Sequence, residues 1–193
     1  MTFAAVVLAA GGGSRFRDAN GEPASTHKLL APLRGQSVLH WAVTAALGAE
    51  ADELVVVVGA VEPDDIDLPF EATVLANPRW RDGQASSLQV AAAHARGQGH
   101  DAIVIGLGDQ PLLAPSAWRD VSRATDTPIA TATYDGKRGH PVRLAASVWH
   151  DLPDSGDTGA KGLLAARPEL VTEVECKGNP ADIDTMEDRA RWS

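Results

Sequence analysis

The sequence predicts an α/β protein of three layers, in which a mainly parallel, twisted β-sheet is covered by helices on both faces. Its strand-length apolar runs are nearly all continuous rather than alternating, and strands buried on both faces have this pattern. Segments of helical period lie between these runs, and such alternation of strand and helix is typical of a layered α/β domain. The runs span residues 4–10, 53–60, 72–76, 101–107 and 128–134.

Two helices between these strands have recognisable starts. Residues 37–49 begin with a serine, which is a favoured residue at the first position of a helix. Residues 86–97 open with Ser86 and, three positions later, Gln89, which is the pattern of a capping box. Both segments are therefore expected to lie against the sheet.

Two stretches do not follow the alternation. Residues 17–27 are polar and rich in turn-forming residues, so we expect a mobile loop there. Residues 134–164 are rich in glycine, and we expect a substrate-facing insertion before the last helix. Thr185 stands three residues before Asp188, which indicates the start of that helix.

Length and charge limit the classes of function. The 193 residues are enough for one domain of ordinary size, and we expect a single domain over 1–193. A net charge of −9 argues against a nucleic-acid partner or a membrane surface, because such proteins are normally basic. No apolar run reaches bilayer length, no signal-peptide pattern is present, and the single Cys176 permits no internal disulfide, so we expect a cytoplasmic protein.

The first strand ends abruptly in glycines 11–13, in the stretch "AAVVLAAGGGSRFR". Glycines after a buried strand let backbone amide hydrogens approach an anion, which a Cβ would obstruct. The stretch lacks the third glycine of the dinucleotide fingerprint and the Gly-Lys-Ser/Thr of a P-loop. Arg15 and then Lys28 follow, and both side chains bind phosphate. A phosphate site is the functional interpretation, and a plain tight turn with two solvated cations is the alternative.

The sequence resembles the nucleotidyltransferases related to molybdenum cofactor cytidylyltransferase and guanylyltransferase. Their usual pattern is Leu-Ala-Ala-Gly-x-Ser-x-Arg-Met-Gly, followed closely by Pro-Lys-Leu. Here "LAAGGGSRF" and "HKLL" resemble it, although Arg15 and Lys28 are further apart than usual and Phe16-Arg17 replaces Met-Gly. Further blocks resemble the family in the same order, namely "NPRWRDGQASSL", "LGDQPLL", "RGHPVRL", "GDTGAKGLL" and "DIDTMEDR". The first and third of these resemble the cytidylyltransferase branch more than the guanylyltransferase branch.

The resemblance implies a Rossmann-like nucleotidyltransferase fold of the glycosyltransferase-A type and a Mg²⁺-dependent reaction. In that reaction CTP transfers CMP to the phosphate of a molybdopterin-type acceptor and pyrophosphate is released. Arg15, Lys28 and Asp109 would be catalytic, and Asp109 and Asp184 would hold the metal. The residues implied to contact the nucleotide are Leu8, Ala9, Ala10, Gly11, Gly12, Gly13, Ser14, Arg15, Lys28, Asn77 and Ser86. Those implied to contact the acceptor are Gly139, His140, Pro141, Gly156 and Asp157.

Chemistry from the residues themselves supports the carboxylates. Asp109 directly follows a buried strand, where ligands of α/β proteins gather, and carboxylate oxygens suit Mg²⁺. Aspartate is also common in turns for local hydrogen bonding, and Asp182 is open to either interpretation. His140 is a candidate general base or metal ligand, but no second His or Cys stands at zinc-site spacing.

Other assignments of function remain open at this point. Within the same chemistry they are a guanylyltransferase acting on molybdopterin and a nucleotidyltransferase acting on another phosphorylated metabolite. A different class is a carrier that binds nucleotide or cofactor without catalysis, with a molybdoenzyme as its partner. The carboxylates and Lys28 weigh against a pure carrier, which has no need of metal ligands.

Overall fold

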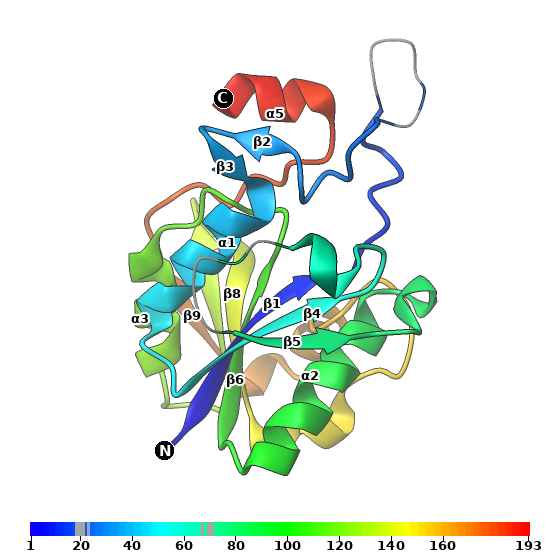
Figure 1. Ribbon diagram of the computed structural model, residues 1–193. Helices are drawn as coiled ribbons and strands as arrows, with labels where there is room; N and C mark the ends of the chain where they lie inside the picture. The colour runs from blue at the N-terminus through cyan, green and yellow to red at the C-terminus, as the bar shows by residue number, and fades with distance from the viewer. Residues whose placement is uncertain (18–21, 23, 67, 69–71) are drawn as a thin grey trace.

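The computed structural model describes residues 1–17, 22, 24–66, 68 and 72–193. A seven-stranded sheet of order β5-β4-β1-β6-β8-β7-β9 forms its centre, and a two-stranded ladder, β2-β3, lies apart (Figure 1). The strands and helices are β1 (Phe3–Ala9), β2 (Pro32–Leu33), β3 (Gln36–Ser37), α1 (Val38–Ala46), β4 (Glu53–Val58), β5 (Thr73–Ala76), α2 (Gln84–Gln98), β6 (Ala102–Leu107), α3 (Pro115–Arg123), β7 (Ile129–Tyr134), β8 (Lys137–Ala145), α4 (Lys161–Ala166), β9 (Val171–Glu175) and α5 (Met186–Trp192).

The sheet is mainly parallel, as the continuous apolar runs predict. β1 pairs in parallel with β4 and β6, and Val6 lies between Val55 and Ile105 in this register. β5 and β9 also pair in parallel with their neighbours. The five predicted strands are confirmed as β1, β4, β5, β6 and β7. Side chains such as Val6 and Val7 are buried on opposite faces of the same strand, which explains the continuous apolar pattern.

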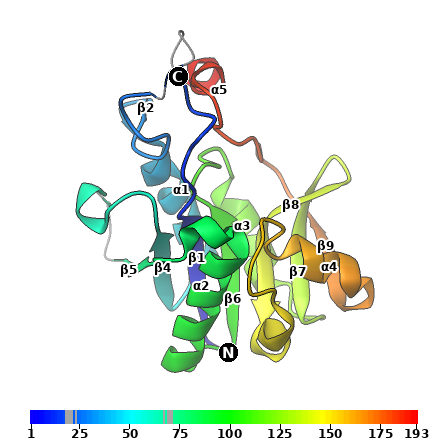
Figure 2. The same cartoon turned by 90° about the vertical axis from the view of Figure 1, so that its right-hand side faces the viewer.

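Helices cover both faces of the sheet and complete the three layers. Side chains of α1 and α3 pack with β1, β4 and β6 in one apolar cluster on one face. Side chains of α2 and α4 pack with the same central strands on the other face. Figure 2 shows α2 in front of the sheet and α1 behind it. None of the helices in the described residues is long and apolar enough to cross a bilayer.

The expectation of an insertion over 134–164 is wrong in its first part. β8 occupies Lys137–Ala145 and lies inside the sheet, antiparallel between β6 and β7. The strand begins with polar, exposed residues and becomes buried only from His140, so its sequence resembles a loop. The turn before it uses the left-handed conformation at Asp135 and Gly136 (φ 50° and 74°), which closes a tight hairpin with β7.

Two of the three predicted helix starts are confirmed. Ser37 caps α1 by accepting a hydrogen bond from the His40 amide, and Thr185 forms a capping box with Asp188 at α5. The capping box expected at Ser86 is wrong, because α2 begins earlier, after Gly83. The predicted mobile loop of 17–27 includes residues 18–21 and 23, which lie outside the described residues.

A small third cluster of apolar side chains attaches the C-terminal segment to the N-terminal part of the chain. Phe16, Leu33, Val38 and Ile183 are buried together in it. α5 consequently lies beside the β2-β3 ladder, far in sequence but near in space (Figure 1). This packing brings the segment before α5 to the carboxyl edge of the parallel strands.

Candidate functional site

The glycine turn follows β1 at the carboxyl edge of the sheet. Among the described residues, none accepts a hydrogen bond from the backbone N–H groups of Gly11, Gly12 or Gly13. A Cβ on Gly12 would lie 2.9 Å from the Trp80 ring, and one on Gly13 (φ 61°) would lie 3.2 Å from His27. A Cβ on Gly11 would meet nothing within 4 Å. Two of the glycines are therefore required by packing within the protein, while Gly11 faces open space.

Trp80 contacts both the glycine turn and an exposed arginine. Its ring packs on Gly12 on one side, and the Arg81 guanidinium lies 4.3 Å from the ring centroid. Asn77 is buried at the start of the turn that carries Trp80, and its amide group donates to the hydroxyls of Ser86 and Ser87 at 2.9 Å each. Asn77 thus supports the turn that carries Trp80.

The predicted nucleotide contacts differ in their position. Leu8, Ala10, Gly11 and Gly12 line a cavity of about 520 Å³, hereafter the glycine-turn cavity. Other residues that line it include Trp80, Arg81, Gly83, Gln84, Ser87, Leu107, Asp109 and Asp157. Predicted contacts outside its lining are the buried Ala9, Asn77 and Ser86, together with Gly13, Ser14, Arg15 and Lys28. Sequence reasoning could not separate Ser86 from Ser87, because only the start of α2 decides which one faces the cavity.

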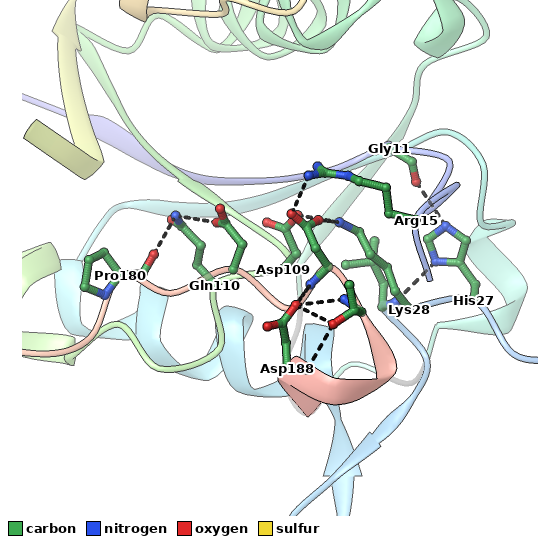
Figure 3. Close-up of polar contacts among 12 residues, drawn as sticks. Gly11, Arg15, His27, Lys28, Asp109, Gln110, Pro180 and Asp188 are labelled. Atoms are coloured by element: carbon green, nitrogen blue, oxygen red, sulfur yellow. Dashed lines mark hydrogen bonds and ion pairs between the residues drawn. The ribbon is translucent and has the colours of Figure 1, made fainter. Parts of the chain in front are cut away.

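Beside this cavity, four predicted charged residues meet in one cluster (Figure 3). The Lys28 ammonium lies 2.6 Å from Asp109 Oδ2 and 3.0 Å from Asp184 Oδ1. The Arg15 guanidinium lies 2.9 Å from the other oxygen of Asp184. In the sequence, Lys28 is 81 positions from Asp109 and 156 positions from Asp184, and this one lysine joins the two aspartates in space.

Local packing explains how the two aspartates come together. The backbone N–H of Ile183 donates to the Asp109 carbonyl at 2.8 Å, and the Ile183 side chain is fully buried. Asp184 follows immediately, and the capping box of Thr185 holds its orientation at the start of α5. Asp182, on the other side, accepts a hydrogen bond from the Gln110 amide at 2.8 Å.

The electrostatics of the cluster keep Lys28 charged. Burial by itself lowers the pKa of Lys28, but the carboxylates of Asp109 and Asp184 outweigh it, and the net effect raises this pKa. The pKa of Asp182 is raised, first by burial and then by the negative charge of Asp109. Lys28 is therefore a permanent cation that balances this acidic corner.

His27, which the sequence pattern does not single out, makes two specific hydrogen bonds. Its Nε2 lies 3.0 Å from the Gly11 carbonyl oxygen, and the Leu29 amide donates to its Nδ1 at 3.2 Å. Its position next to Lys28 was the only sequence signal. His94 and His100 both contact Glu53 at 2.9 Å at the other end of the sheet.

A second cavity of about 690 Å³, hereafter the His140 cavity, lies on the other side of Leu107. Predicted acceptor contacts Gly139 and His140 line it, and Pro141 is buried outside it. Burial, with a smaller effect from the Lys161 charge, lowers the pKa of His140 to about 4, so its ring is neutral. The remaining residues in the lining include Gln110, Tyr134, Asp135, Lys137, Arg138, Lys161, Asn179, Pro180 and Asp182.

The two other predicted acceptor contacts lie elsewhere. Asp157 lines the glycine-turn cavity, and Gly156 packs against Gly83, with its N–H donating to the Asp82 carbonyl at 2.8 Å. The segment that the sequence assigns to the acceptor thus lies at the cavity of the glycine turn. Its contact with an acceptor stays a prediction.

The donor chemistry of the charged cluster suits a hard divalent cation. Mg²⁺ is commonly held by one or two carboxylates together with substrate phosphate oxygens, and Asp109 and Asp184 provide two such carboxylates side by side. Within the described ranges, no three His, Cys, Asp or Glu side chains are arranged to hold a metal by themselves. The protein residues therefore fit a metal that completes its shell with substrate oxygens.

Comparison with known proteins agrees with this geometry. The family model described as "MobA-like NTP transferase domain" matches residues 5–171. The chain is 28% identical over 208 residues to the nicotine blue oxidoreductase of Paenarthrobacter nicotinovorans, covering 96% of this chain and 94% of that protein. Among solved structures, Rv0371c from Mycobacterium tuberculosis H37Rv has a TM-score of 0.82 at 29% identity, over 99% of this chain and 97% of that one.

Two further structures bear on activity and metal. A nucleotidyl transferase from Methanothermobacter (Mth528) has a TM-score of 0.81 at 27% identity, over 98% of this chain and 95% of that one. A structure of Rv0371c in complex with manganese has a TM-score of 0.74 at 30% identity, over 100% and 98% of the two chains. These likenesses confirm the expected Rossmann-like nucleotidyltransferase fold. Because the family model spans most of the sequence, the chain belongs to the family of MobA-like NTP transferase domains and is a nucleotidyltransferase.

Proposed function

We propose that residues 1–193 act as one Mg²⁺-dependent cytidylyltransferase domain, which transfers CMP from CTP to the phosphate of a molybdopterin-type acceptor. The observation that carries this proposal is the ion-pair cluster of Arg15, Lys28, Asp109 and Asp184. It lies beside the amides of the glycine turn, which have no acceptor within the part of the chain that the structure describes. Such a cluster serves the transfer of a charged phosphoryl group, which needs positioning and charge neutralisation above all. The redox activity named for the Paenarthrobacter relative offers no comparable use for it.

In the proposed reaction, an oxygen of the acceptor phosphate attacks the α-phosphorus of CTP. The bond between the α-phosphorus and the bridging oxygen to the β-phosphate breaks, and pyrophosphate leaves. The amide N–H groups of Gly11, Gly12 and Gly13 donate to the triphosphate, and Arg15 and Lys28 neutralise its charge. When bound, Mg²⁺ offsets the negative charge that develops on the leaving group.

Lys28 has two sets of partners in this proposal. In the free protein its ammonium binds Asp109 and Asp184. When the triphosphate enters, the ammonium turns to the phosphate oxygens, and the two carboxylates are released to hold the metal. The shared ion pairs with Lys28 therefore keep the two carboxylates close together until the substrate arrives.

The His140 cavity is the proposed acceptor site. Lys137, Arg138 and Lys161 line it and provide positive charge for a phosphate ester. Leu107 borders both cavities, so an acceptor phosphate at this border would lie next to a nucleotide in the glycine-turn cavity. The choice of CTP rests on the resemblance of "NPRW" and "RGHP" to the cytidylyltransferase branch.

The test is pyrophosphate release with each of the four nucleoside triphosphates, Mg²⁺ and a molybdopterin-type acceptor. We expect turnover with CTP and little with the other three. Preference for GTP would make the protein a guanylyltransferase, and turnover only with another phosphorylated metabolite would replace the acceptor. A folded protein that binds nucleotide but releases no pyrophosphate with any combination would support a carrier and refute the proposal.

A further inference from the structure

The imidazole of His27 links the glycine turn to the segment that carries Lys28 (Figure 3). The Leu29 amide donates to Nδ1, so Nδ1 is an acceptor and carries no proton. The proton of the neutral ring is therefore on Nε2, which donates to the Gly11 carbonyl at 3.0 Å. Burial lowers the pKa of His27, which agrees with a neutral ring.

The hydrogen bond to Gly11 fixes the plane of one peptide group. The peptide between Gly11 and Gly12 is trans, so its C=O and its N–H point in opposite directions. Because the C=O points to His27, the Gly12 N–H points away from the ring. His27 stays outside the lining of the glycine-turn cavity, whereas Gly12 is part of it.

The other side of the link is firmly anchored. Leu29 is buried in the main apolar cluster, and its carbonyl accepts a hydrogen bond from the Leu39 amide at 2.9 Å. The His27 carbonyl likewise accepts from the Leu30 amide at 2.9 Å. His27 thus attaches the glycine turn to a segment that is anchored in the core. This attachment reduces the entropy cost of ordering the backbone of the glycine turn when a ligand binds.

This arrangement departs from the family pattern that the sequence resembles. The family pattern that the sequence resembles has proline directly before the lysine, and a proline side chain makes neither hydrogen bond of His27. The connection between Arg15 and Lys28 is also longer here than that pattern has it.

We propose that His27 is a positioning residue, whose Nε2–H holds the Gly11–Gly12 peptide in the orientation that binds a polyphosphate. The inference rests on the proposed function only in placing a triphosphate at this turn. It makes no assumption about the base or the acceptor. His27 itself touches neither substrate nor metal in this scheme.

Three substitutions separate the two hydrogen bonds of the ring. His27→Gln places an amide N–H near the position of Nε2 and retains a donor for Gly11. His27→Asn places a carbonyl oxygen near Nδ1 and retains an acceptor for the Leu29 amide, as in an Asx-turn, but does not reach Gly11. His27→Ala removes both. The exposed His150 provides a matched control, His150→Gln.

The probe is inorganic tripolyphosphate with Mg²⁺, titrated by calorimetry into each full-length variant. We expect His27→Asn and His27→Ala to bind about tenfold more weakly than the wild-type protein, in line with one orienting hydrogen bond. We expect His27→Gln and His150→Gln to bind within about threefold of it. The melting temperature of each variant is measured alongside. If His27 had a purely structural role, the loss of tripolyphosphate affinity would instead follow the loss of melting temperature across the variants.

Equal weakening in His27→Gln and His27→Asn, or tight binding by His27→Asn, would overturn the proposal. So would an imidazole ¹⁵N NMR spectrum of the wild-type protein in which Nδ1 carries the proton. The same titrations with CTP distinguish the two levels of inference. If tripolyphosphate shows the expected pattern while CTP does not bind, the positioning role stands and the cytidylyltransferase assignment fails.

Discussion

The two cavities on either side of Leu107 are built in different ways. The glycine-turn cavity lies at the end of parallel strands, and its lining includes Gly11, Gly12 and Gly83, which offer only main-chain groups. The His140 cavity lies at an antiparallel strand, β8, and is lined by charged and polar side chains. Main-chain amides recognise the phosphates that all nucleotides share, whereas side chains suit recognition of one particular partner.

The charges of the two cavities also differ in their pairing. At the glycine turn, Arg15 and Lys28 are neutralised by Asp109 and Asp184 in the free protein. At the His140 cavity, Lys137 and Lys161 form no ion pair with any described residue. An anion that binds Arg15 and Lys28 must therefore displace their carboxylate partners, while the His140 cavity offers two lysines that are already available.

The largest effect is expected for the residue that belongs to the paired cluster. Asp109→Asn removes a negative charge that both Lys28 and a metal would use, so we expect pyrophosphate release to fall by about a thousandfold. The melting temperature should stay close to that of the wild-type protein, because the side chain is only partly buried. Asp126→Asn, at an exposed position in the loop before β7, is the matched control. Wild-type turnover in Asp109→Asn would remove this aspartate from the mechanism.

A second prediction concerns the His140 cavity and the stability of the fold. An unfolded chain protonates this histidine near pH 6.5, whereas in the folded protein the pKa of His140 is about 4. Between these values the unfolded state binds more protons, so the free energy of unfolding should fall by about 3 kcal/mol as the pH drops from 6.5 to 4.

Urea unfolding at pH 7.5 and pH 4.5 measures this loss, with His140→Gln as the comparison. The carboxylates contribute equally to both proteins, so the difference between the two slopes isolates the histidine. We expect the variant to lose less stability on acidification than the wild-type protein. Parallel slopes would show that His140 is protonated normally in the folded state.

A third prediction sharpens the contrast between paired and unpaired lysines. Lys28→Met frees Asp109 and Asp184 from their internal cation, so we expect the free protein to bind Mn²⁺ more tightly, by about tenfold. The same variant should bind CTP more weakly. Lys161→Met, in the His140 cavity, should change neither the Mn²⁺ affinity nor the CTP affinity. It should instead raise the KM for the acceptor. Titration with Mn²⁺ by electron paramagnetic resonance measures the first effect, and weaker Mn²⁺ binding by Lys28→Met would contradict it.

The same contrast explains how far sequence reasoning reached. The parallel half was predictable, because continuous apolar runs and a glycine turn are local signals. β8 was missed because its first residues, Lys137 to Gly139, are polar or exposed, and only its neighbours in the sheet make it a strand. β9 is an edge strand with half-exposed side chains, so its pattern is equally weak.

Within the site, residue type was predictable and orientation was not. Arg15, Lys28, Asp109 and Asp184 were identified together, and the structure brings them into contact. Asn77 and Ser86 were also assigned to the nucleotide, yet both polar groups are directed into the protein. Whether a polar side chain points to a ligand or to a neighbouring turn depends on tertiary packing, which a single sequence does not display.

The smallest effects should come from the glycines themselves, and they separate packing from ligand contact. Gly12→Ala pushes a methyl group against Trp80, so we expect a loss of about 1 kcal/mol in the free energy of unfolding. Gly11→Ala meets open space at a φ that alanine adopts, so its stability should stay unchanged or rise slightly. Its methyl group nevertheless lies at the rim of the cavity, and we expect CTP to bind about threefold to tenfold more weakly.

Thermal melts and calorimetric titrations of the two variants test this pair directly. A variant of Gly11 that keeps both its stability and its affinity for CTP would show that no ligand approaches the turn at this point. Internal packing through Trp80 and His27 would then explain Gly12 and Gly13, and nothing in the structure would require a glycine at position 11. If Gly11→Ala is stable but binds CTP poorly, close approach of the ligand is the reason that position 11 carries no side chain. Such close approach to the main chain is the property that distinguishes the glycine-turn cavity from the His140 cavity.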